Sequence, residues 1–203
     1  MNKPSAKYQL LLTRLAELGS PCRSLDALRT SGHRYSEAIP LLVQWLPLLD
    51  DPAEQEALVR TLSVPWARNS EVARALIREF AKASQRPLRW AIGNALEVTA
   101  TAAEADVLLP LVRNPSFGTA RQMVVRALGR VGGQSAVPVL LELLSDEETV
   151  GHAAWALGKL RATKATSQLN AMRDHPIGWV RRTVARSLRQ IAKESEHRPS
   201  LGE

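Results

Sequence analysis

The sequence contains few of the residues that build disulfide scaffolds, β-sheets or membrane spans. One cysteine, Cys22, stands among 203 residues, so no internal disulfide can form, and a single thiol fits a reducing compartment. Aromatic residues make up 4% of the chain, which leaves mainly Leu, Ala and Val for the core and favours helices. No apolar stretch approaches the roughly 18 residues of a membrane helix. We therefore expect a cytoplasmic protein without a membrane partner.

The sequence also lacks a recognisable catalytic or metal-binding pattern. Neither His-x3-His nor Cys-x2-Cys occurs, and the four histidines fall in different parts of the chain: His33, His152, His175 and His197. No Gly-Lys-Ser/Thr follows the glycines at 129, 132 and 133, which excludes a phosphate loop. Cys22 has only Arg23 beside it, a weak setting for a nucleophile. We expect no catalytic residue, no metal and no cofactor.

Positive charge is present in excess along the whole chain. Lysine and arginine number 27 against 20 acidic residues, which gives a net charge of +7 and a pI of about 10.2. No separate basic tail carries this excess, so it belongs to the folded surface. Such a surface attracts acidic proteins or nucleic acids.

One pattern recurs with a period of 29 to 34 residues: a small residue followed by leucine, near the end of a helical run. The leucines are Leu28, Leu62, Leu96, Leu128, Leu157 and Leu188. Apolar residues also stand four before each of the last five leucines and three after each of the last three, which places them on one stripe of a helix. A regular period of this size is typical of one helical unit stacked repeatedly, with this stripe as the buried face of its second helix.

Shorter apolar helices are predicted between these second helices, over 37–49, 71–82, 103–112, 135–144 and 164–172. Two of them open on Ala-x-Pro, at Ala38–Pro40 and Ala136–Pro138, where proline suits a first helical turn. We predict an all-α fold, a right-handed α-solenoid of stacked helix pairs. One repeat domain covers 1–193, followed by a polar tail. The domain begins with a cap or degenerate repeat at 1–34 and continues with repeats at about 35–66, 67–100, 101–132, 133–161 and 162–193. The tail covers 194–203.

The stretches SAVPVLLELLSDEETVGHAAWALGKL and WVRRTVARSLRQIA resemble short HEAT-type repeats, the kind first named from phycobilin lyases. The block RWAIGN at 89–94 is similar to small bacterial HEAT-repeat proteins of unassigned function. The resemblance covers roughly 35–193 and implies a solenoid whose second helices line a concave surface. It also implies a structural ladder, in which an arginine seven residues before the leucine bonds to Asp or Asn in the preceding turn. The ladder residues here are Arg89, Arg121 and Arg181, with Asn114 and Asp174 as expected acceptors.

The repeat frame predicts which side chains of the second helices point away from the core. Positions two and six before each leucine lie on the open side, and Trp179 falls there too. We expect these binding residues on the concave face: Arg60, Trp90, Asn94, Arg126, His152, Trp155, Trp179, Arg182 and Arg186. Trp and Arg are enriched at binding hot spots.

Simpler explanations exist for these positions. Each Trp can pack flat against the neighbouring repeat, and His152 can be a lone surface histidine. The stripe of Arg182, Arg186, Arg189 and Lys193 can be the polar outer face that a terminal repeat needs, or it can bind phosphate.

Three functions follow in order of preference. The first is a non-enzymatic scaffold or adaptor that holds an acidic protein partner on the Trp/Arg-lined face. The alternative is a nucleic-acid-binding HEAT-repeat protein. The third, a DNA glycosylase built from HEAT-like repeats, requires an acid four residues after a concave tryptophan. Asn94, Lys159 and Thr183 occupy those places here, which speaks against base excision.

Overall fold

The computed structural model describes residues 3–197, with side chains through Lys193. The described residues form α-helices, short 3-10 helices and loops, and include no strand. This confirms the predicted all-α solenoid of helix pairs. The chain divides into two compact units, Met1–Thr101 (unit 1) and Ala102–Glu203 (unit 2). The division falls next to the repeat border predicted between 100 and 101, while the single domain over 1–193 and the right-handed twist stay predictions.

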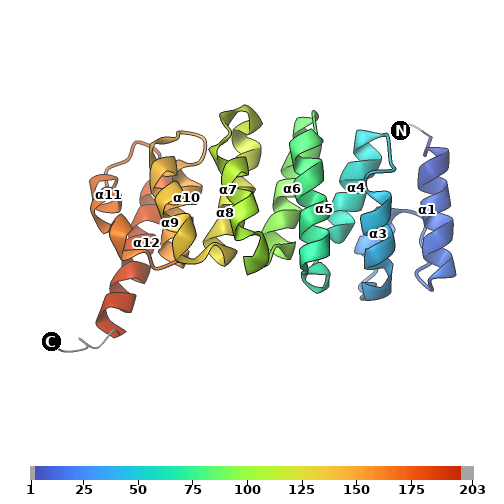
Figure 1. Ribbon diagram of the computed structural model, residues 1–203, viewed down its shortest axis with the longest axis horizontal. Helices are drawn as coiled ribbons and strands as arrows, with labels where there is room; N and C mark the ends of the chain where they lie inside the picture. The colour runs from blue at the N-terminus through green and yellow to red at the C-terminus, as the bar shows by residue number, and fades with distance from the viewer. Residues whose placement is uncertain (1–2, 198–203) are drawn as a thin grey trace. The chain divides into compact units, whose positions relative to one another are not determined.

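Unit 1 consists of three helix pairs that follow one another in chain order (Figure 1). The pairs are α1 (Ala6–Glu17) with α2 (Leu25–Arg29), α3 (Ile39–Trp45) with α4 (Pro52–Leu62), and α5 (Ser70–Lys82) with α6 (Arg86–Thr99). Two 3-10 turns, η1 (Ser36–Ala38) and η2 (Pro65–Ala67), precede α3 and α5. The second helices α2, α4 and α6 pack in sequence. The predicted cap or degenerate repeat at 1–34 therefore contains a helix pair of its own.

Unit 2 repeats the same arrangement (Figure 1). Its pairs are α7 (Ala105–Arg113) with α8 (Arg121–Val131), α9 (Val137–Glu142) with α10 (Val150–Lys159), and α11 (Thr166–Ala171) with α12 (Gly178–His197). The 3-10 segments are η3 (Ala102–Glu104), η4 (Pro115–Ala120), η5 (Gly133–Ala136), η6 (Leu143–Ser145) and η7 (Thr163–Ala165). Helix α10 packs between α8 and α12.

Local sequence explains where several helices begin. In unit 1, side-chain oxygens accept hydrogen bonds from first-turn N–H groups, which otherwise have no partner. The caps are Ser5 on α1, Ser24 on α2, Asp51 on α4 and Asn69 on α5. Proline occupies the first turn of α3 and of α9, as the two Ala-x-Pro openings predict.

The predicted buried stripe is confirmed. Five of the six repeat leucines are buried, as are all five residues that stand four positions before the last five leucines: Leu58, Ile92, Val124, Ala153 and Val184. Leu188 is the exception and is half-buried. It lies on α12, the last second helix, so no further helix pair follows it among the described residues.

Several predicted helices differ from the observed ones at their ends. The segment predicted over 37–49 is α-helical only in α3, after η1. The segment predicted over 135–144 is a short α9 flanked by η5 and η6, since helix ends often tighten into 3-10 turns. Helix α12 continues four residues past Lys193, into the predicted polar tail. Residues 198–203 of that tail lie outside the described residues. None of the helices formed by the described residues is both long and apolar enough to span a membrane.

Candidate protein-binding surface

Six of the predicted binding residues lie on the second helices of unit 2. Helix α8 carries Arg126, α10 carries His152 and Trp155, and α12 carries Trp179, Arg182 and Arg186. Because α8, α10 and α12 pack in order, these side chains come from successive repeats of one compact unit. We call this set the unit-2 face.

Trp155 connects two repeats of the unit-2 face. The guanidinium carbon of Arg126 lies 4.1 Å from the centroid of the Trp155 ring, a cation–π distance. A Cβ added at Gly129 would come within 3.0 Å of the Trp155 ring, which shows how closely the ring approaches α8. Trp155 is half-buried. It therefore packs against the neighbouring repeat, as the simpler explanation expects, and keeps part of its surface accessible beside an arginine.

Trp179 is the most exposed tryptophan of this face, with 43% of its surface accessible. Its ring lies over Gly151 on α10, where an added Cβ would meet ring carbons at 1.9 and 2.1 Å. The His152 ring lies edge-on, with centroids 5.4 Å apart. Trp179 thus rests on the preceding repeat by one side and presents the other to solvent.

His152 is neutral at physiological pH. Burial, together with the positive charge of Arg126, lowers its pKa to about 4. Its Nδ1 atom is buried and has no hydrogen-bond partner among the described residues. His152 therefore supports the Trp179 ring as a half-buried aromatic rather than acting as a surface cation.

Arg182 and Arg186 supply the free charge of the unit-2 face. Both are exposed on α12, and neither forms an ion pair with a described residue. They stand three and seven residues after Trp179, so the three side chains share one side of the helix. An exposed indole beside two unpaired guanidiniums fits an acidic ligand that also offers apolar surface.

The other predicted binding residues lie in unit 1. Arg60 and Asn94 line a hollow of about 240 Å³, together with Arg29, Ser63 and Ala91. Arg60 is already paired, since its Nη2 lies 2.6 Å from Oε1 of Glu56. Asn94 donates from Nδ2 to the backbone oxygen of Trp90 at 3.0 Å, and Trp90 is half-buried. That these residues share one concave face with those of unit 2 stays a prediction.

The arginine ladder binds backbone carbonyls of the preceding turn. Arg89 donates to the carbonyl oxygens of Phe80 and Ala83, and Arg181 donates to those of His175 and Pro176. Both arginines therefore satisfy carbonyls that have no helical partner. The expected bond from Arg181 to Asp174 is not formed.

Arg121 is the buried centre of a charge cluster, while its partners Asp146 and Glu148 are 25% and 42% exposed. Its side chain is 2% exposed and donates to the carbonyl of Val112, to Asp146 at 2.6 Å and to Glu148 at 2.7 Å. The two acids come from the turn of the following repeat, so Arg121 ties two repeats together as the ladder implies. The acceptor differs from expectation, because Asn114 instead accepts from the Ser116 N–H. Burial opposes ionisation of Asp146, but hydrogen bonds from Arg121 and two backbone N–H groups lower its pKa.

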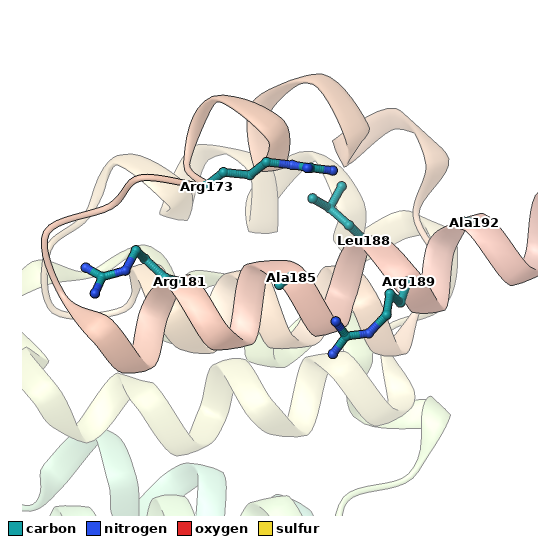
Figure 2. Close-up of a pocket in the computed structure, with 6 residues that line it drawn as sticks. All are labelled: Arg173, Arg181, Ala185, Leu188, Arg189 and Ala192. Atoms are coloured by element: carbon teal, nitrogen blue, oxygen red, sulfur yellow. The ribbon is translucent and has the colours of Figure 1, made fainter.

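Sequence reasoning missed two hollows. One, about 460 Å³, is lined by residues of the α11–α12 repeat: Arg173, Arg181, Ala185, Leu188, Arg189 and Ala192 (Figure 2). The other, about 650 Å³, contains Cys22 in the α1–α2 repeat. Burial raises the pKa of the Cys22 thiol, which disfavours a thiolate there. Among the residues that the structure describes, no group of three or more His, Cys, Asp or Glu can hold a metal ion.

Comparison with known proteins supports the repeat architecture. A family model described as HEAT repeats matches residues 105–189. This stretch runs from α7 into α12 and includes Arg121, Trp155 and Trp179. No curated protein matches the chain significantly.

Proposed function

Because this chain is a HEAT-repeat protein, we propose that it is a non-enzymatic scaffold that holds an acidic protein partner on the Trp/Arg face of its second helices. HEAT repeats generally mediate protein–protein interactions. The finer assignment, to this face and to an acidic partner, rests on one observation. Trp179 is exposed next to Arg182 and Arg186, which have no carboxylate partner among the described residues.

The chemistry of this cluster favours a protein ligand with carboxylates around an apolar anchor. Guanidiniums bind carboxylates with two parallel hydrogen bonds, and an indole supplies rigid apolar area with few rotatable bonds. Trp155 and its Arg126 partner extend the same chemistry to the neighbouring repeat. These Arg and Trp side chains extend over three successive second helices, α8, α10 and α12, which suits an extended or helical segment more than a small molecule.

The proposal is tested by capture of cellular protein on the immobilised chain, with Trp179→Ala and Arg182→Glu/Arg186→Glu as variants. We expect both variants to lose the captured partner while circular dichroism shows unchanged helicity. Trp155→Ala should act in the same direction, since it removes the ring that Arg126 covers. A double variant of exposed residues elsewhere in unit 2, Arg113→Glu/Lys164→Glu, carries the same change of charge and should retain the partner. Equal capture by all variants contradicts the surface assignment.

Nucleic acid is the competing ligand, and the same arginines favour it. Titration of single- and double-stranded DNA and RNA, followed by tryptophan fluorescence at two salt concentrations, separates the two. Saturable quenching that weakens steeply with salt would indicate phosphate binding through counterion release. We expect no such quenching at physiological salt.

A further inference from the structure

The last repeat presents a surface that every earlier repeat buries. Three residues before each repeat leucine, the second helices carry Leu25, Val59, Gly93, Val125 and Ala154, and all five are buried. The corresponding residue of α12 is Ala185, and it is exposed. The repeat leucine of α12, Leu188, is the only one that is not fully buried. The packing surface of the last helix pair is therefore open.

This surface forms a groove of about 460 Å³ with an apolar floor and a basic rim (Figure 2). Ala185, Leu188 and Ala192 supply the floor along α12. Figure 2 shows Arg173 extending above Leu188 from the chain that precedes α12, with Arg181 and Arg189 on the helix itself. We call this the terminal groove. Its floor lies on a different side of α12 from Trp179 and Arg186, while Arg189 stands seven residues after Arg182 and borders both surfaces.

The rim arginines have no carboxylate partner among the described residues. Arg173 donates to the side chain of Asn170, Arg181 donates to two backbone carbonyls, and Arg189 makes no such contact. Asp174, next to Arg173 in sequence, forms no ion pair with any of them. Three uncompensated guanidiniums around an apolar floor attract an anionic ligand with an apolar side.

Unit 2 itself shows what fits such a place. Arg121 occupies the same position in its repeat as Arg181 does in the last one, seven residues before the leucine. Arg121 also donates to backbone carbonyls before its helix, and in addition binds Asp146 and Glu148 of the following repeat. Arg181 has the carbonyl contacts but lacks the two acids. An incoming helix with acidic residues would complete the pattern.

The close approach of neighbouring second helices seen around α10 does not extend to this surface. One residue after the leucine, α8 and α10 carry Gly129 and Gly158. An added Cβ at these glycines would lie 2.7 Å from the backbone of the next second helix, so the backbones nearly touch there. In α12 this position is Arg189, so an occupant lies further from the backbone of α12 than α10 lies from that of α8. A second copy joined end to end through the same groove would also set arginines against arginines, which is unfavourable.

We propose that the terminal groove docks an amphipathic helix of a protein partner, with Ala and Leu contacts along the floor and Glu or Asp on the arginine rim. Its apolar floor is separate from Trp179 and Arg186 of the unit-2 face, so the chain can hold two acidic segments. The apolar side of the helix covers Ala185, Leu188 and Ala192. Its acids pair with Arg173 and Arg189. A further carboxylate binds Arg181, as Asp146 and Glu148 bind Arg121.

The test uses a synthetic peptide of about 18 residues, five helical turns, with Leu and Ala on one side and Glu on both flanks. A second peptide has Lys in place of every Glu. We expect saturable binding of the Glu peptide to the full chain by fluorescence anisotropy, and none of the Lys peptide. The variant Arg173→Glu, which changes no residue of the unit-2 face, should weaken the Glu peptide about tenfold or more. Lys164→Glu, the same change of charge at an exposed residue of unit 2 outside both surfaces, should stay within about twofold.

Several outcomes would overturn the assignment. Equal losses in Arg173→Glu and Lys164→Glu would mean attraction by net charge alone, and binding of both peptides would mean apolar contact without selectivity. Tighter binding of a thymidine oligonucleotide that depends on Arg173 and Arg189 would make the groove a phosphate site. Absence of binding by either peptide would leave it as a polar end cap. Because Arg173→Glu leaves Trp179, Arg182 and Arg186 in place, failure here is distinguishable from failure of the unit-2 face.

Discussion

The two units of this chain build the same helix pairs with different kinds of contact. In unit 1, hydroxyl groups bond to backbone groups of neighbouring segments: Tyr8 Oη accepts from the Leu25 N–H, and Tyr35 Oη donates to the Thr61 carbonyl. In unit 2, glycines let neighbouring helices approach closely, and Arg121 binds two acids of the next repeat. The match to the HEAT-repeat family lies inside unit 2. The fold therefore depends on the buried leucine stripe, which both units share, and tolerates different connections between repeats.

The largest expected effect comes from breaking the charge cluster of unit 2. Arg121→Met removes a buried guanidinium and leaves Asp146 and Glu148 without their cation. We expect the free energy of unfolding, measured by urea denaturation, to fall by about 3 kcal/mol or more. Arg113→Met is the matched control, because its ion pair with Glu142 is exposed and should contribute little. Similar losses in both variants would contradict the importance of burial.

Glycine packing in unit 2 gives the next largest effect. Gly158→Ala would place a Cβ 2.7 Å from the Ser187 backbone, so α10 and α12 must separate. We expect a loss of about 1–3 kcal/mol in the free energy of unfolding. Gly178→Ala, where the nearest side-chain atoms lie at 3.5 and 3.6 Å, should be neutral or slightly stabilising. If Gly158→Ala proves as mild as the control, the helices are less tightly held than their geometry indicates.

In unit 1, the matching contact is the bond between Tyr8 and the Leu25 N–H. Tyr8→Phe removes the acceptor and leaves a buried donor without a partner, at a cost of about 1–2 kcal/mol. Tyr35→Phe serves as the comparison within the same unit, since it removes a donor from a carbonyl instead. Urea denaturation of both variants would show whether hydroxyl contacts stabilise the packing between repeats in unit 1, as glycines and Arg121 do in unit 2. No loss in either variant would contradict this view.

The effect that is smallest at neutral pH is a pH dependence that unit 2 carries through His152. Because the pKa of His152 is lowered from 6.5 to about 4, the unfolded chain takes up a proton at higher pH than the folded chain. The contribution of neutral His152 to the free energy of unfolding is therefore fully present above about pH 6.5 and is lost as the pH falls toward 4. The melting temperature should decrease over this window, and His152→Gln should remove that part of the slope. An unchanged slope would assign it to other groups.

Much of the fold could be predicted because it follows from local patterns. The leucine period, the apolar stripe and the Ala-x-Pro openings depend on residues within a few turns of one another. The partners of Arg121 could not be found this way, since Asp146 and Glu148 stand 25 and 27 residues away and meet it only after two repeats stack. The terminal groove was missed for a related reason. Ala185 has the same character as Ala154, and only its place in the last repeat leaves it exposed.

The Arg121 cluster also affects the order in which the repeats of unit 2 unfold. In a repeat protein each helix pair contacts only the helix pairs next to it. A partly unfolded chain therefore has a boundary between folded and unfolded repeats, and each such boundary costs free energy. The bonds from Arg121 to Asp146 and Glu148 raise that cost at the joint between repeats 101–132 and 133–161. Fraying that starts at either end of unit 2 should therefore halt at this joint, and amide hydrogens of α8 and α10 should exchange together and last.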